Sequence, residues 1–369
     1  MKKVIILKID TYDIDFIKSR LTDFIHKHFH PKKIFFGQDK ILLKPNLLMA
    51  SEPSEAIVTH PAIVEAVGRI FKEEGYKVFV ADCPGHSLSN QYLNLIYTTT
   101  GIREVSERLS FDCLYPDKII IKDNIPFAYW VDDFGMVNLA KLKTHQIMVL
   151  TLATKNLYGC VVGLHKSYLH REFPKAEDLS KIILKLYKII NPPLNIVDGI
   201  FALEGRGPAK EGKVKKLGIV IVGDDALYTD YVISKLLGLP LQSNPLLSVA
   251  KKEGLLEEKV EVISEVARIS NFRFPPQFII NYFPPFLIKV ARLFFKFRPA
   301  IDSKCIGCGM CVKSCPKNAI MLYNKKAKID YKNCIMCMCC QEACQVGAVF
   351  LRRNFLLKIL NKFDASNKV

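Results

Sequence analysis

Long apolar segments are scarce in this sequence. It contains no uninterrupted run of the about 18 apolar residues that a membrane-spanning helix needs. The first eight residues include only four consecutive apolar ones, too few for the hydrophobic core of a secretory signal, so residues 4–8 predict a first strand instead. We therefore expect a protein without a transmembrane segment that works in the cytoplasm, where cysteines stay reduced.

Common nucleotide and hydrolase motifs are also missing. The chain has no P-loop and no G-x-S-x-G sequence, and Gly205 and Gly207 lack the third glycine of a dinucleotide fingerprint. Nothing resembles a nucleic-acid-binding motif, so we expect no nucleic acid as partner. These absences leave open whether the protein is an enzyme.

Acidic residues are rare in the C-terminal quarter. The whole chain has 53 Lys and Arg against 36 Asp and Glu, a net charge of +17. Residues 268–369 alone contain 18 basic and 4 acidic residues. Such an excess favours an acidic redox partner protein, and it leaves a peripheral contact with an anionic membrane open.

Cysteine is abundant, and eight of the 12 cysteines fall into one repeated pattern. The spacing C-x2-C-x2-C-x3-C occurs twice, and each cysteine of the second copy follows its counterpart by 29 residues. The two copies are Cys305, Cys308, Cys311 and Cys315, then Cys334, Cys337, Cys340 and Cys344. This stretch resembles the two-cluster bacterial ferredoxin domain and predicts two [4Fe–4S] clusters. Zinc sites and disulfide frameworks show other spacings.

In that pattern three closely spaced cysteines surround one cluster and the fourth reaches the other. The prediction for the first cluster is Cys305, Cys308, Cys311 and Cys344, and for the second it is Cys334, Cys337, Cys340 and Cys315. Cys339 is surplus to this spacing and is expected to be a packed free thiol. The second copy departs from the pattern after Cys344, where Gln345 replaces the proline found at Pro316.

Residues 1–270 alternate between short apolar runs and segments with helical periodicity. Strands are expected at 4–8, 40–48, 77–82, 118–122, 136–141, 195–200 and 217–223, and helices at 15–29, 61–74, 179–190 and 228–237. This alternation predicts an α/β fold with a mostly parallel sheet covered by helices, followed by a small α+β ferredoxin-like domain.

Polar side chains cluster after the predicted strands, where open α/β sheets bind ligands. Lysines there suit an anionic small molecule, and asparagines can orient it. The predicted catalytic residues are Lys143, His145 as proton donor, and Lys155; the predicted substrate-binding residues are Lys44, Asn46, Asn156, His165 and Lys166. Further histidines and carboxylates that could bind a metal are His60, His170, Asp198, Glu204, Asp224 and Asp225.

Six segments between about residues 38 and 235 carry a family resemblance. They are LKPNLL, THP, NLAKLKTH, TLATKNLYGCVVGLHK, NIVDGIFALEGRGP and GIVIVGDDALYTD. In this order they resemble the domain-of-unknown-function family 362, whose members often carry a ferredoxin-type segment. The resemblance implies an iron–sulfur protein and an enzyme domain without naming a reaction.

The predicted organisation has four parts. Residues 1–270 form the α/β domain, 271–299 a proline-rich linker with an amphipathic helix, 300–351 the ferredoxin-like domain, and 352–369 a basic amphipathic tail. Helices are expected over 286–297 and 352–363, either packed on the protein or in contact with a membrane.

The leading functional hypothesis is an iron–sulfur oxidoreductase whose α/β domain binds an anionic small molecule. One alternative is an electron carrier or adaptor whose α/β domain docks a partner protein. Another is a metal-handling or cofactor-maturation protein that uses the histidines and carboxylates.

Overall fold

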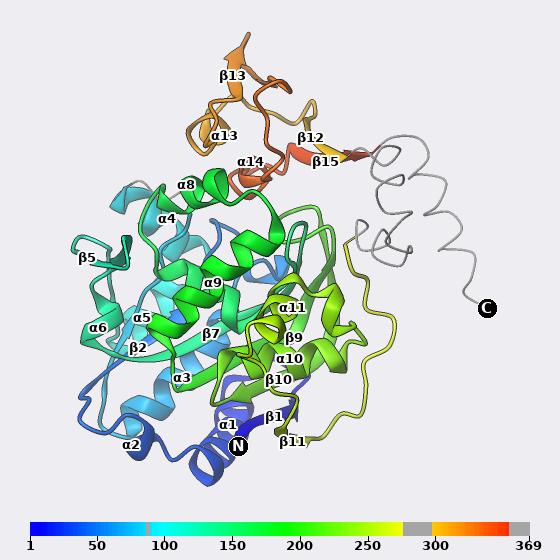
Figure 1. The fold of residues 1–369 in the computed structure, drawn as a ribbon. Helices are drawn as coiled ribbons and strands as arrows, with labels where there is room; N and C mark the ends of the chain where they lie inside the picture. The colour runs from blue at the N-terminus through cyan, green and yellow to red at the C-terminus, as the bar shows by residue number, and fades with distance from the viewer. Residues whose placement is uncertain (86–88, 276–296, 354–369) are drawn as a thin grey trace.

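The computed structural model describes residues 1–85, 89–275 and 297–353. Residues 1–275 are called the α/β portion and residues 297–353 the ferredoxin portion. Figure 1 shows the ferredoxin portion stacked on one end of the α/β portion, with its short helix α14 (Cys339–Glu342) nearest to it. The helices predicted over 286–297 and 352–363 lie, apart from their end residues, outside the described residues.

A nine-stranded mixed sheet forms the centre of the α/β portion. Its spatial order is β11 (Val260–Ser264), β1 (Lys2–Lys8), β10 (Gly212–Gly223), β9 (Leu194–Gly205), β7 (Gly135–His145), β2 (Lys40–Pro45), β3 (Lys77–Val80) and β4 (Asp112–Cys113), and β8 (Val149–Thr151) pairs with β7. The pairs β1–β11, β7–β9, β2–β7, β2–β3 and β3–β4 are parallel, whereas β10 and β8 run antiparallel to their neighbours. The predicted mostly parallel α/β fold is confirmed.

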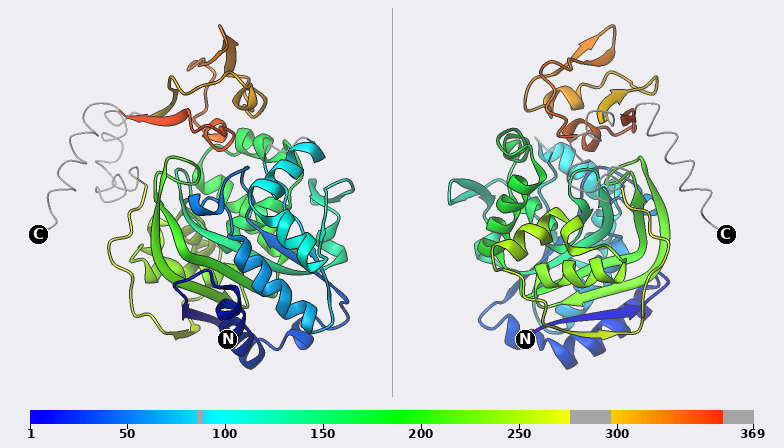
Figure 2. Two further views of the ribbon diagram at one scale, coloured as in Figure 1. Left: turned by 180° about the vertical axis from the view of Figure 1, so that it is seen from behind. Right: turned by 45° about the vertical axis from the view of Figure 1, so that its right-hand side comes forward.

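Helices cover both faces of this sheet (Figure 2). One layer contains α1 (Ile14–His28), α3 (Pro61–Glu73), α4 (Asn90–Thr99) and α5 (Ile102–Leu109), and the other contains α7 (Ala153–Asn156), α9 (Ala176–Ile190), α10 (Ala226–Leu236) and α11 (Pro245–Lys252). Strand side chains alternate between the layers: Ile41 and Leu43 pack in the first, and Leu42 packs in the second. Because both faces are buried, stretches such as residues 41–43 of β2 and 219–222 of β10 are continuously apolar rather than alternating.

The remaining short elements lie in the connections. They are α2 (Pro31–Ile34), η1 (Pro53–Glu55), α6 (Trp130–Asp133), η2 (Leu157–Cys160), α8 (His165–Glu172) and η3 (Leu241–Ser243). One predicted strand differs in its placement: β5 (Ile119–Lys122) pairs with β6 (Ile125–Ala128) in a separate hairpin rather than in the sheet. The Asp123-Asn124 turn, with φ of 51° and 64°, returns the chain at once and favours this local pairing.

Capping contacts fix the starts of two predicted helices, the first at the predicted residue and the second two residues earlier than predicted. Pro61 is the first residue of α3, and the His60 side chain accepts a hydrogen bond from the Ala62 N–H at 3.1 Å. Asp225 caps α10 by accepting from the N–H groups of Leu227 and Tyr228.

The ferredoxin portion repeats a small unit. Helix α13 (Met310–Lys313) and helix α14 occupy equivalent places 29 residues apart, in agreement with the cysteine spacing. Strand β12 (Phe297–Ile301) pairs with β15 (Val349–Arg353), and β13 (Ile320–Tyr323) pairs with β14 (Lys326–Ile329).

The carboxyl ends of the parallel strands meet at one edge of the sheet, and the ferredoxin portion lies against this edge. Glu342 of α14 contacts His145 at the end of β7, with 3.0 Å between Oε1 and Nε2. Gln341 donates to Glu211 at 2.9 Å, and the Leu351 N–H donates to the same carboxylate at 3.2 Å. Gln345 also contacts Tyr92 of α4. These side-chain contacts place α14 over the edge where α/β sheets bind ligands.

Candidate functional site

The two predicted cysteine sets gather around two separate cavities. One cavity is lined by Cys305, Cys308, Cys311 and Cys344, together with Ile301, Val346 and Val349. The other is lined by Cys315, Cys334, Cys337 and Cys340, together with Pro299, Ile320 and Ile329. In each set the sequence-distant fourth cysteine comes from the other copy of the repeat, as the spacing predicts.

Both cavities fit a [4Fe–4S] group in their donor chemistry. Each offers the four thiols of its predicted set in an apolar surround, the ligand set such clusters use, and the second cavity is also lined by Cys339. Backbone N–H groups also point at sulfurs: Ala319 donates to Cys315 at 3.2 Å, and Ala348 donates to Cys344 at 3.1 Å. The two contacts are related by the 29-residue repeat. Hydrogen bonds of this kind stabilise the negative charge of cluster sulfurs and tune the reduction potential.

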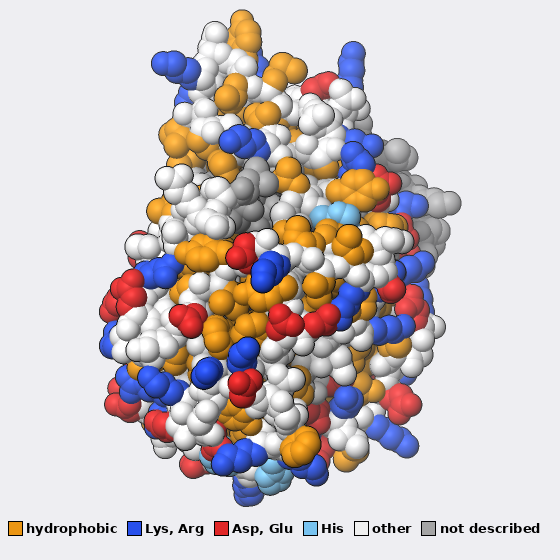
Figure 3. Space-filling view, turned by 90° about the vertical axis from the view of Figure 1, so that its left-hand side faces the viewer, with side chains coloured by type: hydrophobic (Ala, Val, Ile, Leu, Met, Phe, Trp, Pro, Cys, Tyr) orange, Lys and Arg blue, Asp and Glu red, His pale blue; other side chains and the backbone are white. Residues whose placement is uncertain are grey.

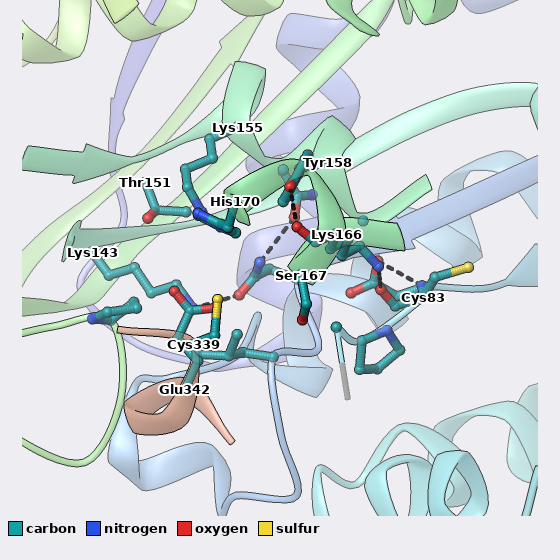
Figure 4. Close-up of a pocket in the computed structure, with 18 residues that line it drawn as sticks. Cys83, Lys143, Thr151, Lys155, Tyr158, Lys166, Ser167, His170, Cys339 and Glu342 are labelled. Carbon is teal, nitrogen blue, oxygen red and sulfur yellow. Dashed lines mark hydrogen bonds between the residues drawn. The ribbon is translucent and has the colours of Figure 1, made fainter. Parts of the chain in front are cut away.

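A third cavity lies between the sheet edge and α14 (Figure 4). It measures about 610 Å³, including the part open to solvent. Its polar lining comes from the segments after β2 and β3, from β7 and β8, from α7 and α8, and from α14. These residues are Asn46, Asp82, Lys143, Thr151, Lys155, Asn156, Tyr158, Lys166, Ser167, His170, Cys339 and Glu342. We call this cavity the junction pocket.

Three lysines give the junction pocket a positive character. Within the described residues, Lys143, Lys155 and Lys166 form no ion pair with a carboxylate. Burial, together with the charge of Lys155, lowers the pKa of Lys143 to about 7. Burial also lowers the pKa of Lys155 and of Lys166. An anion in the pocket would relieve this cost of holding cations away from water.

Lys143 is held by neutral groups. Its Nζ donates to the Asn46 side-chain oxygen and to the Ile57 carbonyl, both at 2.7 Å. The Asn46 amide donates to Asn156 at 3.0 Å, Asn156 donates to Asn138 at 2.8 Å, and Asn138 donates to Asn195 at 2.8 Å. The four amides form one directed chain through the buried sheet edge, so Lys143 is positioned without losing its charge to a carboxylate.

The wall around Asp82 explains one glycine of the NLYGC segment. Lys44 is fully buried and pairs with Asp82 at 2.8 Å. Asp82 also accepts from the Leu47 N–H at 2.8 Å. A Cβ at Gly159 would lie 2.2 Å from the Asp82 oxygen and 2.6 Å from the Lys44 amine, so only glycine fits there. Lys44 therefore stays beneath the pocket as the counter-ion of Asp82.

Helix α14 contributes the acidic wall of the pocket. Figure 4 shows Cys339 and Glu342 facing the cavity from the side opposite Lys155. Burial raises the pKa of Glu342, but the His145 hydrogen bond and the charge of Lys155 outweigh it and leave the pKa well below its usual range. Cys339 lines both the junction pocket and the cavity of Cys315, Cys334, Cys337 and Cys340. The two cavities are thus neighbours.

His145 lies outside the lining of the junction pocket. Its Nδ1 accepts from the N–H groups of Ile147 and Met148, both at 3.1 Å, and its Nε2 faces Glu342. With both ring nitrogens engaged, it is placed to orient the Glu342 carboxylate. Burial and the charge of Lys155 lower the pKa of His145 to about 4.

The structure brings most, but not all, of the predicted residues together. Lys143, Lys155, Asn46, Asn156 and Lys166 line the junction pocket, whereas Lys44, His145 and His165 do not. The pocket also contains His170, which was predicted only as a possible metal ligand, and residues that were not predicted as ligand-binding: Asp82, Thr151, Ser167, Cys339 and Glu342. Asp82 follows a predicted strand, and Lys166, Ser167 and His170 share one side of α8, so these could have been found from spacing. No sequence signal connects Glu342 to this pocket.

A second polar cluster lies along the same edge of the sheet. Lys141 pairs with Asp198 at 2.7 Å, and both side chains are fully buried. Tyr12 donates to Asp198 at 2.9 Å and stacks on His60, with ring centroids 3.5 Å apart. The cluster ties β7 to β9 and to the loops before α1 and α3, and its lysine and carboxylate neutralise each other.

The described residues lack two features that define other classes of protein. In residues 1–85, 89–275 and 297–353, no three His, Cys, Asp or Glu side chains are placed to hold a single metal ion. Within the same ranges, no helix combines the length and the apolar character needed to cross a bilayer.

Comparison with known proteins agrees with this arrangement. A 4Fe-4S dicluster domain matches residues 304–348, which makes the chain an iron–sulfur electron-transfer protein of the ferredoxin type. A domain of unknown function, DUF362, matches residues 41–235, over half of the chain. The protein belongs to the DUF362 family, as its motifs predicted.

Relatives match different parts of the chain. The thylakoid-associated protein sll1697 of Synechocystis sp. is 30% identical over 256 residues, 64% of this chain and 76% of that protein. The uncharacterized protein MJ0749 of Methanocaldococcus jannaschii is 26% identical over 240 residues, 61% of this chain and 92% of that protein. The pyruvate synthase subunit PorD of Methanothermobacter marburgensis is 40% identical over 58 residues, 15% of this chain and 68% of that protein.

Proposed function

We propose that this protein is an iron–sulfur oxidoreductase that binds an anionic small molecule in the junction pocket and carries two [4Fe–4S] clusters. One observation carries the proposal: Cys339 and Glu342 of the ferredoxin portion line the same cavity as Lys143, Lys155 and Lys166 of the α/β portion. A ligand there would contact both portions at once. When bound, [4Fe–4S] clusters exchange single electrons.

The lysines would hold the carboxylate, sulfate or phosphate group of the ligand. Lys155 is suited to this role because its amine has no hydrogen-bond acceptor among the described residues. It lies over the ring of Tyr158, which does not neutralise its charge, and both residues line the cavity. Thr151 adds a buried hydroxyl without a hydrogen-bond partner. Lys143, with a pKa of about 7, can also supply a proton from Nζ, and it replaces His145 in the proposed chemistry.

Titration of the intact protein with sulfate and with succinate tests this assignment. We expect both anions to bind protein purified without oxygen, and to alter the electron paramagnetic resonance spectrum of the reduced protein. The spectrum should respond because the pocket shares Cys339 with a cluster cavity. Failure of protein with full iron content to bind either anion, measured by calorimetry, would contradict the proposal.

The affinity for sulfate should depend on pH through Lys143. The charged groups that act on its amine are Lys155, Glu342, Asp82 and Lys141. A bound anion raises the pKa of Lys143, so binding above pH 7 requires uptake of a proton. The affinity should therefore be constant below pH about 7 and fall by up to about tenfold per pH unit above it. Calorimetry across this range, in buffers of different ionisation enthalpy, measures both the affinity and the proton uptake. A flat profile would exclude Lys143 as an anion ligand.

The electron-carrier hypothesis is supported by the likeness of residues in the ferredoxin portion to the pyruvate synthase subunit PorD. In that case the α/β portion docks a partner protein. The titration with sulfate and succinate distinguishes the two proposals, because an electron carrier needs no small anion and is expected to bind neither. The proposed location is the cytoplasm, where eight cysteines can remain thiolate ligands.

A further inference from the structure

An uncovered apolar patch lies on the β13–β14 hairpin. Met321, Leu322 and Tyr323 are consecutive, and their side chains are 56%, 48% and 55% exposed. The turn at Asn324 and Lys325, with φ of 47° and 56°, folds β14 back on β13, so this two-stranded ribbon presents side chains on both faces. In Figure 1 the hairpin lies at the end of the ferredoxin portion remote from the sheet, and Figure 3 shows hydrophobic side chains gathered over this end.

The hairpin is packed against the first cysteine loop. Lys326 donates to the Ser303 carbonyl at 2.9 Å and also contacts the Cys305 carbonyl. The Ala327 N–H donates to the Cys305 sulfur at 3.4 Å. In the same loop Ile306 is 66% exposed and Cys308 is exposed. The apolar patch therefore continues from the hairpin onto the loop that holds the first cysteine set.

Basic side chains surround this patch. Residues 297–353 contain ten Lys and Arg against three Asp and Glu. One of the three, Glu342, faces the junction pocket instead of the outer surface. Lys325 lies in the turn and Lys326 and Lys328 lie on β14, with the Lys328 amine 3.8 Å from the centre of the Tyr323 ring. An apolar centre with a charged rim is the anatomy of a small, transient protein interface.

We propose that the β13–β14 hairpin and the loop of Ile306 form the docking site for an acidic protein that carries single electrons. The charge of the rim selects an acidic partner and speeds the encounter. The position beside Cys308 brings the carrier to an exposed cysteine of the first set. Each encounter oxidises the carrier by one electron and reduces this protein by one, so no further reagent is needed. This inference does not depend on what the junction pocket binds.

A purified acidic flavodoxin in its fully reduced form serves as the probe. Two quantities are measured without oxygen: the dissociation constant by calorimetry with the oxidised probe, and the second-order rate at which the reduced probe bleaches the visible absorbance of this protein. We expect Leu322→Asp to weaken binding and to lower the rate by about tenfold at low salt. The wild-type rate should fall as salt rises, because the Debye length shrinks from about 30 Å at 0.01 M to about 8 Å at 0.15 M.

The β5–β6 hairpin provides a matched control, because Ile121 is 74% exposed on a two-stranded ribbon of the α/β portion. Ile121→Asp should change neither quantity. If Leu322→Asp loses iron, the charge-reversing variant Lys325→Glu at the turn gives the same test without altering the apolar packing. Wild-type binding and rates in iron-replete hairpin variants would overturn the proposal. A second outcome would also overturn it: the protein binds anionic phosphatidylserine vesicles, the hairpin variants abolish that binding, and the rate of electron transfer from flavodoxin stays unchanged.

Discussion

Cys315→Ala is expected to remove the cluster held by Cys334, Cys337 and Cys340 and to leave the other cluster in place. Cys315 follows Cys311 closely in the sequence, but it lines the cavity of the second set. Cys339 also lines this cavity but falls outside the ligand spacing, so the cluster should be left with three thiolates and be lost. Iron per protein, measured by mass spectrometry under native conditions, should fall from about eight to about four.

Double variants make this test specific. Adding Cys334→Ala to Cys315→Ala should cause no further loss of iron, because both residues line one cavity. Adding Cys305→Ala instead should bring iron close to zero, because Cys305 lines the other. The matched control is Cys339→Ala, which removes a neighbouring thiol outside the predicted ligand set and should leave iron unchanged. If Cys315→Ala and Cys305→Ala together lose only one cluster, the crossed assignment is wrong.

Lys155→Met is expected to weaken sulfate binding while raising the thermal stability of the protein. Loss of a charged ligand in a desolvated site costs about 2–3 kcal/mol, or roughly 30- to 150-fold in Kd. Stability should move the other way, because burial lowers the pKa of Lys155 and the fold therefore disfavours its charge. The variant also removes a positive charge that depresses the pKa of Lys143, so the pH at which sulfate affinity begins to fall should rise.

Lys235→Met on α10 is a close control for this variant. Lys235 lies 5.4 Å from the centre of the Tyr231 ring, as Lys155 lies 5.8 Å from that of Tyr158, but Lys235 is exposed and remote from the pocket. It should leave calorimetric sulfate affinity unchanged. Equal loss of binding in both variants would assign the effect to overall charge. Loss of iron from Lys155→Met would show that the residue supports the fold around α14 rather than a ligand.

Lys155→Met is expected to weaken anion binding and to raise stability because the junction pocket contains buried lysines without carboxylate partners. A pocket whose lysines were all paired with carboxylates would be more stable but would attract no anion. Here Lys44 is neutralised by Asp82, whereas Lys143 is held by the neutral Asn46 and Ile57 groups. The positive charge is thus concentrated on the side chains that face the cavity, and α14 of the ferredoxin portion closes it on the side opposite Lys155.

Most of the secondary structure was accessible from the sequence because its signals are local, and the cysteine spacing predicts the two sets that line separate cavities. His60 and Asp225 cap helix starts through contacts two or three residues away. The periodic apolar runs predict strands because both faces of the sheet are covered. The hairpin placement of β5 was missed, since pairing partners are decided by turn geometry and by neighbouring strands rather than by the strand itself.

The sequence by itself determined that this is an iron–sulfur protein of the DUF362 family, because cysteine spacing and ordered motifs are properties of the chain. The sequence also proposed Lys143, Lys155 and Lys166 as ligand-binding residues, from their positions near the ends of predicted strands and in the loop beyond, and that role stays a prediction. Only the tertiary structure decided that Glu342 joins them, through a contact with His145 across 197 residues. That contact depends on how two separately encoded portions pack, and pairing over such a distance leaves no pattern in either segment.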